Sequence, residues 1–128
     1  MSVANTEKLA LLVWAATTEH PELVATPLVH ALAARALDAE VELHFAGPAV
    51  RWLLAGVAAG ACAAPDSGKS IADFIAEVQQ SGARLHVCSM AAAQWTAAGE
   101  TLLPGVRHAG ATAFVARSLD SAWKTLVY

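Results

Sequence analysis

The segment Leu85–Trp95, "LHVCSMAAAQW", predicts a strand that ends at Cys88 and a helix that begins at the next residue. A cysteine at this junction has two interpretations. Beside a helix N-terminus, its thiolate would face unpaired backbone N–H groups and the positive end of the helix dipole, and both favour the reactive, ionised form. Cysteine is also one of the most frequently buried residue types and often only fills space in a core. The residues alone leave both interpretations open.

Predicted strands and helices alternate on both sides of this segment. Five stretches are expected to be strands: Glu7–Ala16, Val41–Ala46, Ala83–Cys88, Gly105–Ala109 and Trp123–Tyr128. The helices expected between them are Thr26–Asp38, residues 49–59, Ser70–Gly82, Ser89–Ala98 and Gly110–Leu119. Such alternation implies right-handed crossovers and a parallel sheet with helices on both faces. We therefore predict an α/β fold, a three-layer α/β/α sandwich with a mostly parallel five-stranded sheet, formed by residues 1–128 as a single domain.

Capping residues mark the first residues of two predicted helices. Ser70 and Asp73 match an S-x-x-D capping box, in which each side chain accepts a hydrogen bond from the backbone N–H of the other residue. Thr26 and Pro27 are expected to be the N-cap and the first residue of an earlier helix, because proline suits the first helical position. The segment Gly68–Ser70, "GKS", resembles the end of a P-loop. That motif requires a preceding strand and an earlier glycine, and this chain supplies neither, so a nucleotide site is not expected.

Composition limits the classes of function. Of the 128 residues, 56% are hydrophobic and only 15% are charged, which favours an ordered domain that forms an oligomer. The net charge of −3, with scattered lysines and arginines, disfavours a nucleic-acid partner. The longest apolar runs, Leu9–Ala16 and Leu53–Ala64, are too short to cross a membrane. Met1–Lys8 lacks the pattern of a signal peptide, so the cytoplasm is the expected compartment.

The carboxyl ends of the strands are the expected place for a ligand, as in other open α/β sheets. Cys88 is the residue there with intrinsic nucleophilic chemistry. The pocket predicted around it contains Thr17, Thr18, His20, His86, Ser89, Met90 and His108. His86 lies two residues before Cys88 on the same strand, so the two side chains should point to the same side of the sheet. A histidine in that position could tune the protonation of the thiol.

No metal site and no cofactor are predicted. None of the five histidines belongs to an H-x-x-x-H pair or to a Cys/His cluster with zinc-site spacing. If the second, third and fourth strands are neighbours, His44, His86 and His108 could form a row across the sheet, although each has an independent chance of facing the other way. The motifs G-x-S-x-G, H-E-x-x-H and C-x-x-C are also missing from the sequence, so it carries no signature of a hydrolase, a zinc protease or a thioredoxin.

Three blocks of the sequence resemble the DsrE/DsrF-like family, which has the TusBCD/YchN-type sulfur-relay fold. The segment "SGARLHVCSMAAAQW" resembles the "G-v-x-l-x-v-C" strand and following helix of that family. The first strand, "KLALLVWAATTEHP", and the final block, "GVRHAGATAFVARSLDSAWKTLVY", resemble it in the same order, so the likeness covers nearly the whole chain. It implies that Cys88 accepts sulfane sulfur as a persulfide and passes it on. It also implies sulfur donor and acceptor proteins as partners, and a trimer, a hexamer or a mixed oligomer.

Two other functions stay open at this point. One is a non-catalytic, oligomeric small-ligand-binding or scaffold protein of the same fold, in which Cys88 is structural. The other is a redox protein that pairs Cys62 with Cys88, although their spacing matches no known pair motif. Met90 and Trp95 make the expected surroundings of Cys88 apolar, and an apolar pocket opposes ionisation of a thiol.

Overall fold

Five parallel strands form the centre of the structure, a computed structural model that describes residues 6–128. The strands are β1 (Lys8–Val13), β2 (Glu40–Phe45), β3 (Arg84–Cys88), β4 (Arg107–Ala109) and β5 (Trp123–Val127). Their order across the sheet is β4-β3-β2-β1-β5. The predicted α/β class is therefore confirmed. Residues 1–5 of the predicted domain, and with them most of the segment Met1–Lys8 considered as a signal peptide, lie outside the described residues.

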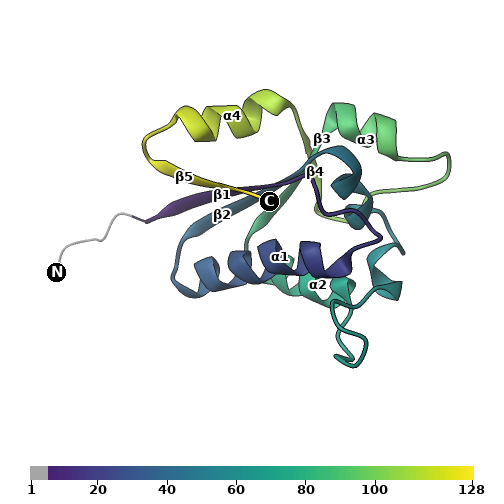
Figure 1. The fold of residues 1–128 in the computed structure, drawn as a ribbon. Helices are drawn as coiled ribbons and strands as arrows, with labels where there is room; N and C mark the ends of the chain where they lie inside the picture. Colours follow the sequence, from purple (N-terminus) through teal and green to yellow (C-terminus); the bar gives the residue numbers. More distant parts are fainter. Residues whose placement is uncertain (1–5) are drawn as a thin grey trace.

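Helices lie on both faces of the sheet, as predicted (Figure 1). The helices are α1 (Pro21–Ala36), α2 (Ile71–Gln80), α3 (Ser89–Trp95) and α4 (Ala111–Leu119), with two short 3-10 helices, η1 (Gly47–Leu53) and η2 (Ala58–Gly60). Figure 1 shows α1 and α2 on one face and α4 on the other, and α3 packs against η1 where β3 ends. Within residues 6–128, no helix is both long enough and apolar enough to cross a membrane.

The two faces of the sheet differ in chemistry. Alternate residues of the central strands, such as Leu43, Phe45 and Val87, are fully buried in one apolar cluster with side chains of α1 and α2. The residues between them, Glu42 and His44 on β2 among them, point to the face that carries α4. No residue of α4 is fully buried. One face of the sheet therefore supplies the apolar core, and the other carries polar side chains.

The prediction that the first helix begins at Thr26 is wrong. Both Pro21 and Pro27 fit the first position of a helix, and the chain uses Pro21, which is six residues earlier. The earlier start places Val24 in the apolar core beside Leu28. Pro27 lies inside the helix, where it is buried and contributes no backbone donor. Of the six residues added before Pro27, Val24 is the buried one, and its burial favours the earlier start.

The predicted helix over residues 49–59 is also wrong, because η1 and η2 replace it. After η1, Leu54 takes an extended backbone and forms an antiparallel bridge with Leu102, and Gly56 has a φ of 85°, which ends any helical path. The helix α3 stops at Trp95 instead of Ala98. Arg51 explains this end, because its guanidinium binds the Trp95 carbonyl at 2.9 Å.

Several predicted strands are longer than the observed ones. The strand β1 ends at Val13 instead of Ala16, although the N–H groups of Trp14 and Ala15 still donate to the carbonyl of Tyr128. The strand β4 has three residues and begins at Arg107 instead of Gly105. These differences shift the ends of elements and leave the order of strands and helices unchanged.

The capping box of α2 is confirmed and can be tested by mutation. The hydroxyl of Ser70 accepts a hydrogen bond from the Asp73 N–H at 3.1 Å, and the Asp73 carboxylate accepts one from the Ser70 N–H at 2.9 Å. We expect Ser70→Ala to lower the free energy of unfolding by about 1 kcal/mol in urea titrations. Ser67→Ala is the control, because the Ser67 hydroxyl bonds only to Lys69 in its own loop. Equal stability of the two variants would contradict this assignment.

Candidate functional site

A buried carboxylate, that of Glu42, connects three elements on the polar face of the sheet. Glu42 is 4% exposed. Arg117 of α4 donates from Nε to Oε1 at 3.0 Å and from Nη2 to Oε2 at 2.8 Å, and Arg84 of β3 donates to Oε2 at 2.8 Å. Nε2 of His44 bonds to Oε1 at 3.1 Å. Each oxygen therefore takes part in two hydrogen bonds, and the carboxylate is saturated.

These partners determine the charge of Glu42. Burial alone raises the pKa of this carboxyl group, but hydrogen bonds from Arg117, His44 and Arg84, together with the charge of Arg117, outweigh it and bring the pKa to about 2. Glu42 is therefore ionised at neutral pH and can only accept hydrogen bonds. The Nε2 atom of His44 must then carry the hydrogen of their bond.

His44 is neutral at neutral pH. Burial lowers the pKa of this imidazole, and Glu42 opposes that effect only in part. Because Nε2 carries the hydrogen, the Nδ1 atom of the neutral ring is a free acceptor. The carboxylate thus selects one tautomer of His44 and fixes the plane of its ring.

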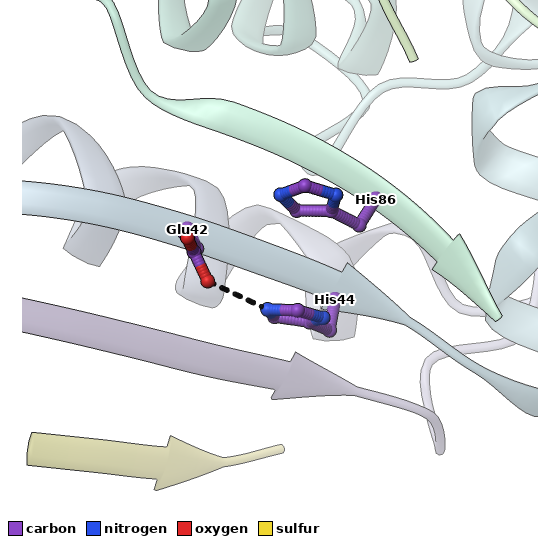
Figure 2. A group of neighbouring side chains, drawn as sticks. All are labelled: Glu42, His44 and His86. Atoms are coloured by element: carbon purple, nitrogen blue, oxygen red, sulfur yellow. Dashed lines mark hydrogen bonds and ion pairs between the residues drawn. The ribbon is translucent and has the colours of Figure 1, made fainter. Parts of the chain in front are cut away.

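His86 stacks on His44 from the neighbouring strand, as Figure 2 shows. The two residues are partners in the register of β2 and β3, and their ring centroids are 4.8 Å apart at an interplanar angle of 17°. Burial lowers the pKa of His86, and the adjacent His44 lowers it further. Both ring nitrogens are buried and meet no hydrogen-bond partner within residues 6–128. The stack therefore consists of two neutral imidazoles.

Glu42, His44 and His86 are close enough to suggest a metal centre, since one potential ligand atom from each lies within 4.8 Å of the others. The charges argue against this. A cation would have to displace charge-assisted hydrogen bonds from a saturated carboxylate, and it would lie beside the guanidinium groups of Arg84 and Arg117. The trio fits a hydrogen-bonded polar network better than a ligand set. Of the three histidines considered for a row across the sheet, His44 and His86 lie side by side, whereas His108 pairs with Val87 and faces the other side of the sheet.

Cys88 lies on the wall of a pocket of about 190 Å³ at the carboxyl ends of the strands. Residues of β1, β2 and β3 form one side, and the beginning of α4 with Phe114 and Val115 forms the other. Cys88 is the last residue of β3 and is half-buried. It lies two residues beyond His86, so it is diagonal to His44 on the same face. Cys88 and His44 are the titratable residues of this pocket.

The residues predicted for the pocket lie elsewhere in the structure. Thr17 and Thr18 are half-buried in the connection between β1 and α1, and the exposed His20 bonds to Glu22. Ser89 and His108 line a separate, open groove beside α3, which has no lining residue in common with the Cys88 pocket. Met90 is 76% exposed on α3.

Glu42 and His44 were not among the predicted site residues. Their signal is present in the sequence, since "VELHFA" places two polar residues at alternate positions of a strand whose other residues are apolar. That pattern assigns them to one face of the sheet. Which groups they meet there depends on the pairing of β2 with β3 and on the docking of α4.

The fold and the pocket define a parallel α/β protein with a thiol at the carboxyl edge of its sheet. The model of the DsrE/DsrF-like family matches residues 8–128, so the chain belongs to that family and the predicted relationship is confirmed. No curated protein matches the chain.

The solved structures that share the fold include two proteins of comparable length. The YchN protein from E. coli has a TM-score of 0.75 and 15% identity, and the match covers 97% of this chain and 100% of that one. MTH1491 from Methanobacterium thermoautotrophicum, described as a protein of unknown function, has a TM-score of 0.62 and 17% identity with the same coverage. At these identities the likeness concerns the fold alone.

The hydrogen bonds of Glu42 predict a pH-dependent stability. Its folded pKa of about 2 lies below the ordinary value of 4.5, so its contribution is complete above pH 4.5 and is lost as the pH falls towards 2. Over that window we expect the free energy of unfolding to fall by up to about 3 kcal/mol more in the wild type than in Glu42→Gln. Urea titrations at pH 5, 4, 3 and 2 measure the difference. Parallel pH profiles for the two proteins would contradict the proposed charge state.

Proposed function

We propose that this protein is a sulfur carrier that accepts sulfane sulfur as a persulfide on Cys88 and passes it to a cysteine of a partner protein. The observation that carries this proposal is the position of Cys88. It lies at the carboxyl end of β3, on the wall of a pocket at the edge where parallel α/β sheets bind ligands. Membership of the DsrE/DsrF-like family supports the same chemistry.

The reaction is an exchange at sulfur. The Cys88 thiolate attacks the outer sulfur of a donor persulfide, the new Sγ–S bond forms, and the donor S–S bond breaks. The bonding electron pair leaves with the donor, which becomes a thiolate and then a thiol. In the second step, the thiolate of an acceptor attacks the outer sulfur on Cys88 and restores the free cysteine. No external oxidant or reductant is required.

The pocket suits the end of a sulfur donor. Its volume of about 190 Å³ corresponds to about six water molecules, which is below the usual range for sites that enclose a drug-sized ligand. Apart from Cys88 and His44, its lining consists of aliphatic residues, glycine and phenylalanine. Sulfane sulfur is polarisable and weakly hydrated, so such walls can surround it. The remainder of the donor would stay outside the pocket.

The exposed side chains near Cys88 are consistent with docking of the sulfur donor and acceptor proteins. Met90, two residues after Cys88, is 76% exposed, and Trp95 on the same helix is 37% exposed. Exposed apolar side chains next to a reactive site are typical of a docking surface. Further exposed apolar residues on α4 and β5, Leu119 and Val127 among them, support an oligomer. We place the transfer between such partners in the cytoplasm.

A second candidate rests on the apolar lining of the pocket. Walls of this kind also suit a small apolar ligand, and Cys88 would then only pack against it. The protein would be a binding or scaffold protein of the same fold. Transfer of sulfur to Cys88 separates the two candidates.

Mass spectrometry after incubation with inorganic polysulfide tests the proposal. We expect one or more sulfur atoms to be added to the intact protein and removed by a reductant. The addition should disappear in Cys88→Ser and persist in Cys62→Ser. Cys62 is the matched control because it is exposed and does not line the pocket.

Two results would contradict the carrier function. A folded protein that takes up no sulfur would favour the second candidate. A loss of two hydrogens in place of a gain of sulfur would instead indicate a disulfide between Cys62 and Cys88.

A further inference from the structure

We propose that His44 is a catalytic base and acid that takes the proton of Cys88 during sulfur transfer and returns it to the leaving thiolate, with Glu42 as its positioning residue. This inference rests on the proposed function and assigns a role to two residues that the carrier reaction alone does not require. Three observations support it: a shared pocket, a fixed tautomer and a neutral ring.

The first observation is that Cys88 and His44 line the same pocket. They come from neighbouring parallel strands and point to the same face of the sheet. The other lining residues offer no titratable side chain. Phe114 packs edge-on against His44, with ring centroids 5.5 Å apart, and limits access of solvent to the ring. A proton released by Cys88 inside the pocket therefore has His44 as its side-chain acceptor.

The second observation is the direction of the hydrogen bond between His44 and Glu42. The ionised carboxylate accepts from Nε2 at 3.1 Å, so this nitrogen is occupied and the lone pair of Nδ1 is available. A carboxylate that orients an imidazole and selects its tautomer is the arrangement used where histidine moves a proton. Glu42 is itself immobilised by Arg84 and Arg117, so the orientation of the ring is maintained.

The third observation is the balance of charge around His44. The groups that face it are Glu42 on its own strand, Arg84 and His86 on β3, and Arg117 on α4. Burial has the largest effect and lowers the pKa of this imidazole, Glu42 opposes it only in part, and the charge of Arg117 lowers the pKa further, so the ring stays neutral at pH 7 and can accept a proton. The same surroundings make the protonated ring a ready donor to the leaving thiolate.

Atoms, charge and protons balance in the transfer of sulfur to Cys88. Cys88–SH and a donor R–S–S⁻ give Cys88–S–S⁻ and R–SH, with one S–S bond formed and one broken. The thiol proton passes to Nδ1 of His44 as Sγ attacks, and it passes from Nδ1 to the leaving R–S⁻. His44 ends the step neutral, as it began it.

The test compares the rate of persulfide formation from polysulfide between pH 5.5 and 9.5 in a Cys62→Ser background, in which Cys88 is the single thiol. At pH 7 we expect His44→Asn to be slower by about 10²-fold, which is the lower end of the usual effect of losing a general acid or base. The deficit should shrink towards about pH 8.5 and above, where an ordinary thiol ionises unaided. Glu42→Gln should change the rate in the same direction by a smaller factor, because Nε2 keeps a weaker acceptor.

His108→Asn is the matched control. It removes an imidazole from the same edge of the sheet but from the opposite face, outside the Cys88 pocket. We expect its rate to stay within about twofold of the parent and its pH profile to be unchanged. Circular dichroism confirms that each variant is folded. If His44→Asn does not fold, His44→Gln and Glu42→Gln supply the same comparison.

A second reaction separates failure of this inference from failure of the proposed function. Alkylation of Cys88 by iodoacetamide reports thiol ionisation without sulfur transfer. Equal rates and pH profiles for His44→Asn and the parent, in a protein that does take up sulfur on Cys88, would overturn the role of His44 and leave the carrier function intact. If the parent takes up no sulfur, the carrier function is wrong. In that case, identical pH profiles of iodoacetamide alkylation for the parent and His44→Asn would reject the role of His44 as well.

Discussion

The saturated carboxylate of Glu42 is the constraint on which the site depends. The helix α4 has no fully buried residue, so few contacts fix its position. Arg117 ties this helix to the sheet, since its guanidinium binds both oxygens of Glu42 and lies 4.1 Å from the ring centre of Trp123. The beginning of α4 is in turn one wall of the pocket that contains Cys88. The pocket therefore has its shape because one carboxylate on β2 anchors a helix that apolar packing holds only weakly.

The two faces of the sheet contribute differently to stability: one is packed with apolar side chains, and the other carries the hydrogen-bonded network of Glu42. The apolar face supplies the stability, with fully buried side chains such as Phe45 and Trp52, and the indole N–H of Trp52 is satisfied by the Ala16 carbonyl at 2.9 Å. Buried ion pairs add little net stability compared with apolar packing, because desolvation cancels much of their attraction. We therefore interpret the network of Glu42 as a device that orients His44 and α4.

Local sequence patterns were sufficient to predict the order of strands and helices and the position of Cys88 at the end of a strand. The capping box at Ser70 and the strand that ends at Cys88 depend on neighbours within a few residues, and the structure has both. The start of α1 was mispredicted because Thr26 before Pro27 is the better local cap signal, whereas the helix begins at Pro21 after the uncapped His20 and buries Val24. The surroundings of Cys88 could not be predicted in this way. They depend on the register of β2 with β3 and on a contact between Glu42 and Arg117, which are 75 residues apart in the sequence.

Proton transfer between Cys88 and His44 requires one tautomer and one charge state of the His44 ring. Long-range ¹H–¹⁵N NMR spectra of the imidazole, assigned by comparison with His44→Asn, report which nitrogen carries the hydrogen. We expect a neutral ring protonated on Nε2 at pH 7, which becomes charged only below the ordinary histidine value of 6.5, since burial lowers the pKa of His44. A ring that is cationic at pH 7, or one protonated on Nδ1, would contradict this expectation, because Nδ1 could then accept no proton from Cys88.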